Sequence, residues 1–137
     1  MVEHSDCVAA AAQEILQSAC GLKVEGPRDV KGLVGDIAAS IDLVAENGWR
    51  VHVVLPQATA GAIVMKFFGF ELPFDSPDMA DAVGELANIL GGEIKRQLES
   101  IGRKAELGLP QVVRGEALGD LLPPGIDSRS LGFTTDA

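Results

Sequence analysis

Two acidic residues and an amide occupy one face of a stretch that is typical of a single long helix, residues 76–101. Ser76 can cap this helix, and Pro77 suits its first position. Apolar residues recur at helical spacing along it: Val83, Leu86, Leu90, Ile94, Leu98 and Ile101. At about 100° per residue, Asp81, Glu85 and Asn88 fall within roughly 60° of one another, opposite the apolar stripe. The sequence therefore predicts an exposed face with two carboxylates and an amide, a group that can hold a water molecule.

Three glycines, Gly84, Gly91 and Gly92, lie inside the same predicted helix, beside this polar face. A glycine in a helix interior costs about 1 kcal/mol relative to alanine. Close approach of another backbone is the usual compensation, so we expect a neighbour to contact the helix there. Tight packing of Gly91 and Gly92 on a second helix of the same chain is the alternative.

A polar helix face need not be a site. An acid and an amide three residues apart are common on solvated helices, and Asp81 could simply complement the helix dipole. Acid–base catalysis by paired carboxylates, as in glycosidases, is disfavoured because Asp81 and Glu85 are predicted on an open face without a cleft.

Composition narrows the class of protein. The 137 residues suit one domain, and 47% of them are apolar. The net charge of −9 argues against nucleic acid or an anionic membrane as partner. The sequence has neither a basic leader nor an apolar run long enough for a membrane span, which favours the cytoplasm. Cys7 and Cys20 are expected to be free thiols, and His4 and His52 give no zinc-like spacing, so no metal site is predicted.

The remaining elements predict an α+β fold, a mainly antiparallel sheet with helices packed on one side. Asn47-Gly48 is a strong hairpin signal between two strands. The connector 69–75 carries phenylalanines that we interpret as packing residues. We expect a helix at 6–20, a turn or irregular edge at 22–31, strands at 33–46 and 49–55, a helix at 57–68, a strand at 107–115 kinked at Pro110, and the start of a strand at 131–135.

The spacing of four residues resembles the signature of the CheC/CheX family of chemotaxis phosphatases. Asp81 is followed after three residues by Glu85, after two more by Asn88, and after twenty-one by Pro110. The surrounding text, DAVGELANILGG and LGLPQVVRG, is similar to the CheX branch of that family. The resemblance extends over about residues 7–118.

This resemblance implies hydrolysis of the aspartyl phosphate on a phosphorylated CheY-type response regulator. Glu85 would dock on the lysine of the receiver domain, and Asn88 would orient the attacking water. Asp81 would occupy an accessory acidic position, and Pro110 would shape the neighbouring strand. The chain would need no cofactor of its own because the receiver brings Mg²⁺. The chemistry is consistent with these roles, since phosphoryl transfer depends mainly on positioning and electrostatics.

Two further expectations follow from the resemblance. CheX-like proteins form homodimers through a continuous sheet, and they continue past the position of Thr135 with another strand. We therefore expect residues 1–137 to form a single CheX-like domain whose C-terminal strand is missing or incomplete. A non-catalytic module of the same fold, binding a response regulator or a flagellar-switch-type partner, is the alternative function.

Overall fold

The chain folds around β2, the strand that pairs with every other strand of the larger sheet. The computed structural model describes residues 2–31, 35–44, 48–121 and 130–136. Its elements, in chain order, are α1 (Val2–Glu14) with a π-helical turn (Ile15–Ala19), β1 (Val24–Asp29), β2 (Ile37–Val44), β3 (Trp49–Leu55), α2 (Gln57–Phe68), α3 (Pro77–Ser100), β4 (Glu106–Leu107), β5 (Gln111–Arg114), a 3₁₀ segment (Gly115–Asp120) and β6 (Leu131–Thr135).

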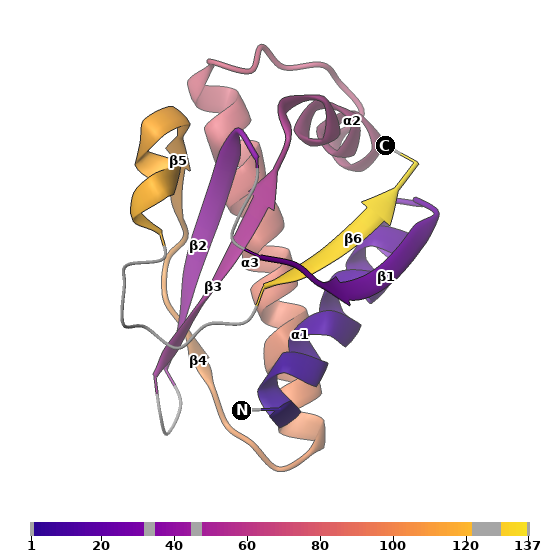
Figure 1. Ribbon diagram of the computed structural model, residues 1–137, viewed down its shortest axis with the longest axis vertical. Coiled ribbons are helices and arrows are strands. Elements are labelled where there is room, and N and C mark those ends of the chain that lie inside the picture. Colours follow the sequence, from indigo (N-terminus) through magenta and orange to yellow (C-terminus); the bar gives the residue numbers. More distant parts are fainter. Residues whose placement is uncertain (1, 32–34, 45–47, 122–129, 137) are drawn as a thin grey trace.

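In the larger sheet β2 lies between β3 on one side and β4 and β5 on the other, and all pairs are antiparallel (Figure 1). β4 and β5 meet opposite ends of β2, where Leu43 faces Leu107 and Ile37 faces Arg114. The strand expected at 107–115 is divided into β4 and β5, and residues 108–110 belong to neither. Pro110 has no N–H to donate to a ladder, which fits a break in the strand before Gln111.

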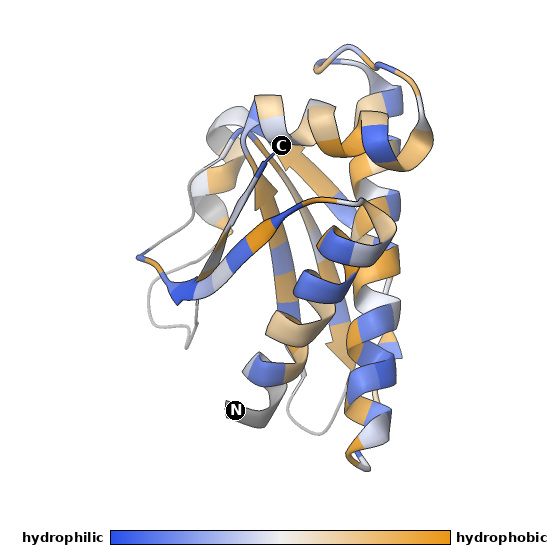
Figure 2. Cartoon of the chain, turned by 90° about the vertical axis from the view of Figure 1, so that its right-hand side faces the viewer, coloured by the Kyte–Doolittle hydropathy of each residue, from blue (hydrophilic) through white to orange (hydrophobic). Residues whose placement is uncertain are grey.

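Alternate residues of β2 form the centre of the core. Ile37, Ala39, Ile41 and Leu43 are buried and face the helices. They pack with α1, α2 and α3, which therefore cover the same face of the sheet. In Figure 2, hydrophilic and hydrophobic residues alternate along α3, as expected of a helix with one buried face. The predicted fold class, an antiparallel sheet with helices on one side, is confirmed.

Several predicted elements match the structure closely. The strand at 49–55 and the helix at 57–68 have the predicted bounds, and α3 lies one residue inside the predicted range at each end. The helix expected at 6–20 is covered by α1 and the π-helical turn. Of the strand expected at 33–46, the structure has 37–44 as β2. Positions 33, 34, 45 and 46, and Asn47 of the predicted hairpin turn, lie outside the described residues.

The segment 22–31, expected to be a turn or an irregular edge, contains an edge strand whose register is irregular. Residues Val24–Asp29 form β1, which pairs antiparallel with β6 in a separate two-stranded ribbon (Figure 1). The register shifts between Glu25 and Arg28, around Gly26 and Pro27. A proline in an edge strand at such an irregularity is common. The strand expected to begin at 131–135 is β6.

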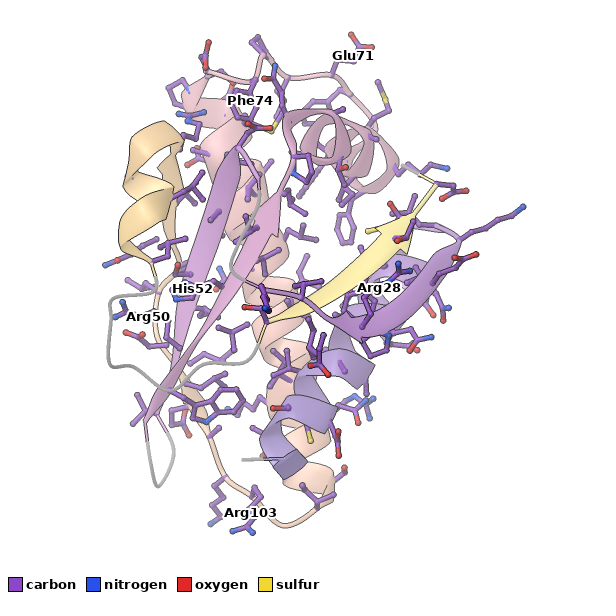
Figure 3. All side chains as sticks on the ribbon, in the orientation of Figure 1. Arg28, Arg50, His52, Glu71, Phe74 and Arg103 are labelled. Atoms are coloured by element: carbon purple, nitrogen blue, oxygen red, sulfur yellow. The ribbon has the colours of Figure 1, made fainter. Side chains whose placement is uncertain are left out.

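The face of the sheet turned away from the helices carries polar contacts between β2 and β3. The Oγ of Ser40 lies 2.6 Å from Nδ1 of His52, and Nε of Arg50 donates to Asp42 at 2.6 Å. Arg50 and His52 follow one another along β3 in Figure 3. Burial lowers the pKa of His52, and the positive charge of Arg50 lowers it further. His52 thus has a structural contact within the sheet.

Candidate functional site

The start of α3 is fixed by its own cap. The hydroxyl of Ser76 accepts a hydrogen bond from the N–H of Met79 at 3.1 Å and donates one to the carbonyl of Pro73 at 2.7 Å. Pro77 occupies the first turn, and Asp78 lies beside the positive end of the helix dipole. These local interactions determine where α3 begins, and hence which of its residues face solvent.

Arg114 of β5 ties the sheet to this helix start. Its Nη1 donates to the carbonyl of Phe74 at 2.6 Å and to the carbonyl of Ser76 at 3.2 Å. Its guanidinium also lies 5.9 Å from the centre of the Phe74 ring. One side chain thus holds the connector and the cap of α3 against the strand that follows Pro110.

Replacing Arg114 by alanine is expected to lower the free energy of unfolding by about 1.5–3 kcal/mol, because two charge-assisted hydrogen bonds are lost. Chemical denaturation measures this loss. Arg28→Ala on β1 (labelled in Figure 3) is the matched control, since the side chain of Arg28 is exposed and has no hydrogen bond or ion pair to another described residue. Equal stabilities of the two variants would contradict the anchoring role of Arg114.

The predicted polar face of α3 is open to solvent, and its side chains bond no other residue that the structure describes. Asp81 and Glu85 are exposed, and Asn88 is half-buried. Across residues 2–31, 35–44, 48–121 and 130–136, no hydrogen bond or ion pair to any of these three side chains is formed. The two carboxylates and the amide therefore remain available to a partner from outside the chain.

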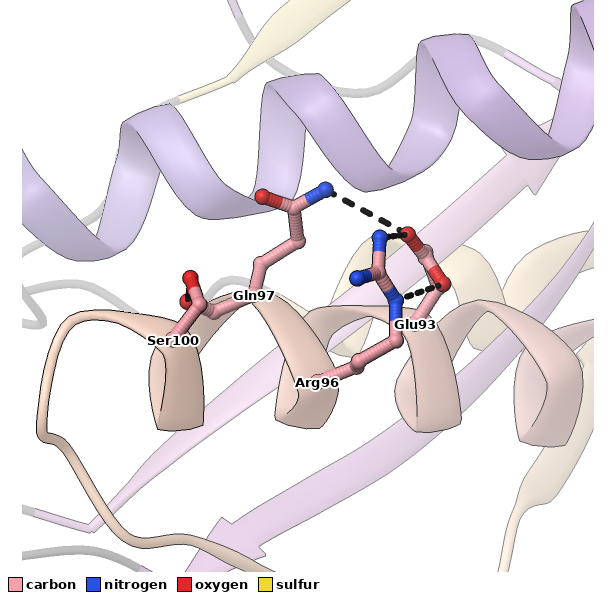
Figure 4. Close-up of polar contacts among 4 residues, drawn as sticks. All are labelled: Glu93, Arg96, Gln97 and Ser100. Atoms are coloured by element: carbon pink, nitrogen blue, oxygen red, sulfur yellow. Dashed lines mark hydrogen bonds and ion pairs between the residues drawn. The ribbon is translucent and has the colours of Figure 1, made fainter.

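The far end of the same helix differs in this respect. Nε and Nη2 of Arg96 each donate a hydrogen bond to one carboxylate oxygen of Glu93, and the amide of Gln97 donates to Glu93 at 3.3 Å (Figure 4). The hydrogen bond from Arg96 lowers the pKa of Glu93. Polar residues there satisfy one another, as solvated helix faces commonly do. The partnerless acids and amide are a feature of the N-terminal half of α3.

Pro110 lies directly beside this half of the helix. A Cβ atom on Gly84 would be 3.4 Å from Cγ2 of Val112 and 3.8 Å from Cγ of Pro110. A Cβ atom on Gly91 would likewise meet Leu107 at 3.3 Å. Residues 107–110 therefore run along α3 past Asn88, which lies between the two glycines. Leu109, in the middle of this segment, is 88% exposed.

The expectation that all three glycines lie beside the exposed face is wrong for two of them. Gly84 and Gly91 are buried and face the sheet of the same chain. A Cβ atom placed on Gly91 would lie 3.1 Å from Cδ1 of Ile41. Side chains of the sheet, and not another backbone, are their close neighbours. Gly92 alone is exposed, with nothing within 4 Å of a Cβ. It shares the face of Glu85 and Asn88.

Comparison with protein families adds the observation that decides the relationship. The model of the family described as chemotaxis phosphatase CheX matches residues 37–120, which is more than half of the chain and includes Asp81, Glu85, Asn88 and Pro110. The chain belongs to the CheX family. None of the curated proteins compared with it matches.

Solved structures similar to this CheX-family chain have the same fold. A CheC-like superfamily protein from Shewanella sp. PV-4 has a TM-score of 0.77 at 19% identity, covering 100% of this chain and 91% of its own. The CheX–CheY–BeF3–Mg complex from Borrelia burgdorferi gives 0.75 at 17%, covering 97% and 90%. The chemotaxis protein CheX from Vibrio vulnificus gives 0.72 at 22%, covering 82% and 74%.

The described part of this CheX-family chain offers no metal-binding cluster of His, Cys, Asp and Glu. The same part contains no helix that is long and apolar enough to span a bilayer. Cys7 and Cys20 are buried and are not joined by a disulfide, and burial raises the pKa of the Cys20 thiol.

Two features of the site were missed by the sequence reasoning. Arg114 carries no local motif, because its partners lie about forty residues earlier and become neighbours only through the β2–β5 pairing. Phe70 was interpreted as a packing residue, but it is 53% exposed. With Phe68, Leu72 and the acids of α3 it lines a hollow of about 400 Å³. A phenylalanine between glycine and glutamate, in a connector without periodicity, was the available signal.

Proposed function

We propose that this chain hydrolyses the aspartyl phosphate of a CheY-type receiver domain. Asn88 enters the phosphorylation site and orients the attacking water, and Glu85 docks on the receiver. The observation that carries this proposal is that the side chains of Glu85 and Asn88 share one face of α3 and bond no other described residue, inside the segment matched by the CheX family. Asp81 is an accessory acid on the same face, and Pro110 supports the helix beside Gly84.

The chemistry requires little from the chain itself. An acyl phosphate is already activated, and a receiver domain supplies Mg²⁺ and a lysine that balance charge on the transferring group. A correctly positioned water is what remains to be provided. A neutral amide can do this because it donates and accepts hydrogen bonds at once. Positions three apart on a helix are about 5–6 Å from each other, so one rod can dock through Glu85 and insert Asn88.

The test is the decay of a phosphorylated receiver with Mg²⁺, alone and with substoichiometric amounts of this chain. We expect the chain to shorten the lifetime of the phosphoryl group over many turnovers. Unchanged decay for every CheY-type receiver of the source genome would contradict the proposal. Binding without turnover would instead identify a non-catalytic module that recognises a response regulator.

The glycine on the exposed face provides a sharper prediction. Gly92→Ala is expected to stabilise the protein by about 0.5–1 kcal/mol, because alanine suits a helix interior better and meets no neighbour. The same change is expected to raise KM for the receiver, since the added methyl group lies one turn beyond Asn88. Thermal unfolding and turnover kinetics measure the two effects.

Gly61→Ala is the matched control for this variant. Gly61 also lies inside a helix, α2, with nothing within 4 Å of a Cβ. We expect the same gain in stability and an unchanged KM. Equal KM values for both variants would show that the receiver does not approach α3 at Gly92.

We also propose a homodimer with a continuous sheet that works in the cytoplasm. Among the described residues, β3 pairs only with β2, so its outer edge is open to a strand of a second copy. Sedimentation equilibrium tests this assembly, and a monomer at micromolar concentration would contradict it.

A further inference from the structure

A hollow beside the acidic edge of α3 is the feature that the proposed chemistry leaves unused. Phe68 ends α2, Phe70 and Leu72 follow in the connector, and Ala82 completes the apolar part of the lining. The rings of Phe68 and Phe70 are 6.5 Å apart between centroids, at an angle of 51°. Phe68, Leu72 and Ala82 are buried or half-buried, whereas Phe70 is 53% exposed. The hollow therefore has an apolar floor with one aromatic wall open to solvent.

Three carboxylates form the remaining rim of the hollow. Asp78, Asp81 and Glu85 are exposed and line it together, and no basic residue does. None of the three side chains has a hydrogen bond or ion pair with another residue that the structure describes. The rim is thus negatively charged without internal compensation.

The apolar floor and the acidic rim together favour one class of side chain from a partner over the others. A purely apolar side chain would fit the floor but would desolvate the carboxylates without pairing them. An acidic side chain would be repelled. A lysine or arginine satisfies both parts, because its aliphatic stem packs on Phe70 and Leu72 while its cationic head reaches the carboxylates and the ring faces.

We propose that this hollow is a second contact for the receiver partner, and that it takes an exposed lysine or arginine from outside the phosphorylation site. Asp81 and Glu85 belong both to the hollow and to the face that presents Asn88, so a protein docked on that face also covers the hollow. The inference rests on the proposed function for the identity of the partner. It assigns Phe70 and Asp78 to recognition and not to chemistry.

The test compares Phe70→Ser with the wild-type chain. The probe is each CheY-type receiver of the source genome, loaded with beryllofluoride and Mg²⁺, and the readouts are Kd by titration and KM and kcat with the phosphorylated receiver. We expect Kd and KM to rise about tenfold while kcat is unchanged. Ile101→Ser is the matched control, because Ile101 is 45% exposed at the opposite end of α3. It is expected to leave Kd unchanged.

Two further variants identify the occupant. Asp78→Asn should weaken binding and flatten its dependence on salt, because one partner of the incoming cation loses its charge. Phe70→Leu, which keeps an apolar side chain without the ring, should lose part of the affinity. If Phe70→Ser weakens binding but Asp78→Asn and added salt do not, the occupant is apolar and the assignment of a basic side chain is overturned.

The outcomes separate this inference from the proposed function. A wild-type chain that binds receivers without hydrolysing them would overturn the function, yet the Kd of Phe70→Ser would still decide the contact. Normal turnover with an unchanged KM and Kd for Phe70→Ser would overturn the contact alone. A wild-type chain that binds no receiver would overturn both.

Discussion

Replacing Asn88 by alanine is expected to lower kcat for receiver dephosphorylation by about 100-fold or more while KM stays near the wild-type value. The amide is expected to hold the water only as the phosphoryl group transfers, so its loss falls on the chemical step. Turnover kinetics with a phosphorylated receiver measure both constants. A rise in KM with kcat unchanged would instead make Asn88 a docking residue.

Unfolding cannot imitate this result. Asn88 is half-buried and its side chain has no hydrogen bond to another described residue, and alanine is the better helix former by up to about 0.7 kcal/mol. The variant should therefore melt at the wild-type temperature or slightly above it. Asn88→Gln keeps the amide but moves it by one methylene, and about 1 Å of misplacement can itself cost about 100-fold. Glu85→Gln is the comparison for docking, with the larger change expected in KM.

Local sequence signals were sufficient to predict α3, the helix that carries the candidate site. The cap at Ser76, the proline after it and the apolar period predicted α3 almost to the residue, because each acts within a few positions along the chain. The shared face of Asp81, Glu85 and Asn88 followed from helix geometry alone. Their freedom from internal partners could not be predicted, since it depends on which side chains of other elements come near.

Features that depend on distant pairing were harder to predict. Gly26 and Pro27 predict a turn or an irregular edge where the structure has β1, because the partner strand β6 lies about a hundred residues later. The orientation of Gly84 and Gly91 was wrong for a related reason. Both lie at the border between the polar and apolar faces, and the pairing of β4 and β5 with β2 brings the sheet against that border.

Placing Pro110 beside the helix requires both local sequence signals and the pairing of distant segments. The spacing of twenty-one residues between Asn88 and Pro110 matches the period of neither a helix nor a strand, so it does not by itself predict that the two are neighbours. The family resemblance connected the two residues, and the β5 register brings Pro110 to Gly84, one turn before Asn88. Arg114, four residues later at the end of β5, fixes the start of the helix. Residues 110–114 thus support α3 at two points, near Ser76 and at Gly84, which lie on either side of Asp81.

The rigidity of α3 can be separated from its chemistry by a second variant, Ile94→Ala. Ile94 has no exposed surface and lies in the cluster shared by α1, α3 and β2. Removing its side chain should lower the free energy of unfolding by about 2–5 kcal/mol, through lost burial and the cavity left behind. Denaturant titration measures this. Ile101→Ala, at a 45% exposed position of the same residue type, should cost less than about 1 kcal/mol.

The activity of Ile94→Ala is expected to differ from that of Asn88→Ala. Below its melting transition, Ile94→Ala should keep kcat near the wild-type value, because Ile94 lies opposite the polar face and touches no reacting group. Asn88→Ala should be stable and inactive, and Ile94→Ala unstable and active. If Ile94→Ala lost kcat while fully folded, turnover would depend on the exact seating of α3 on the sheet, and the amide alone would not account for the rate.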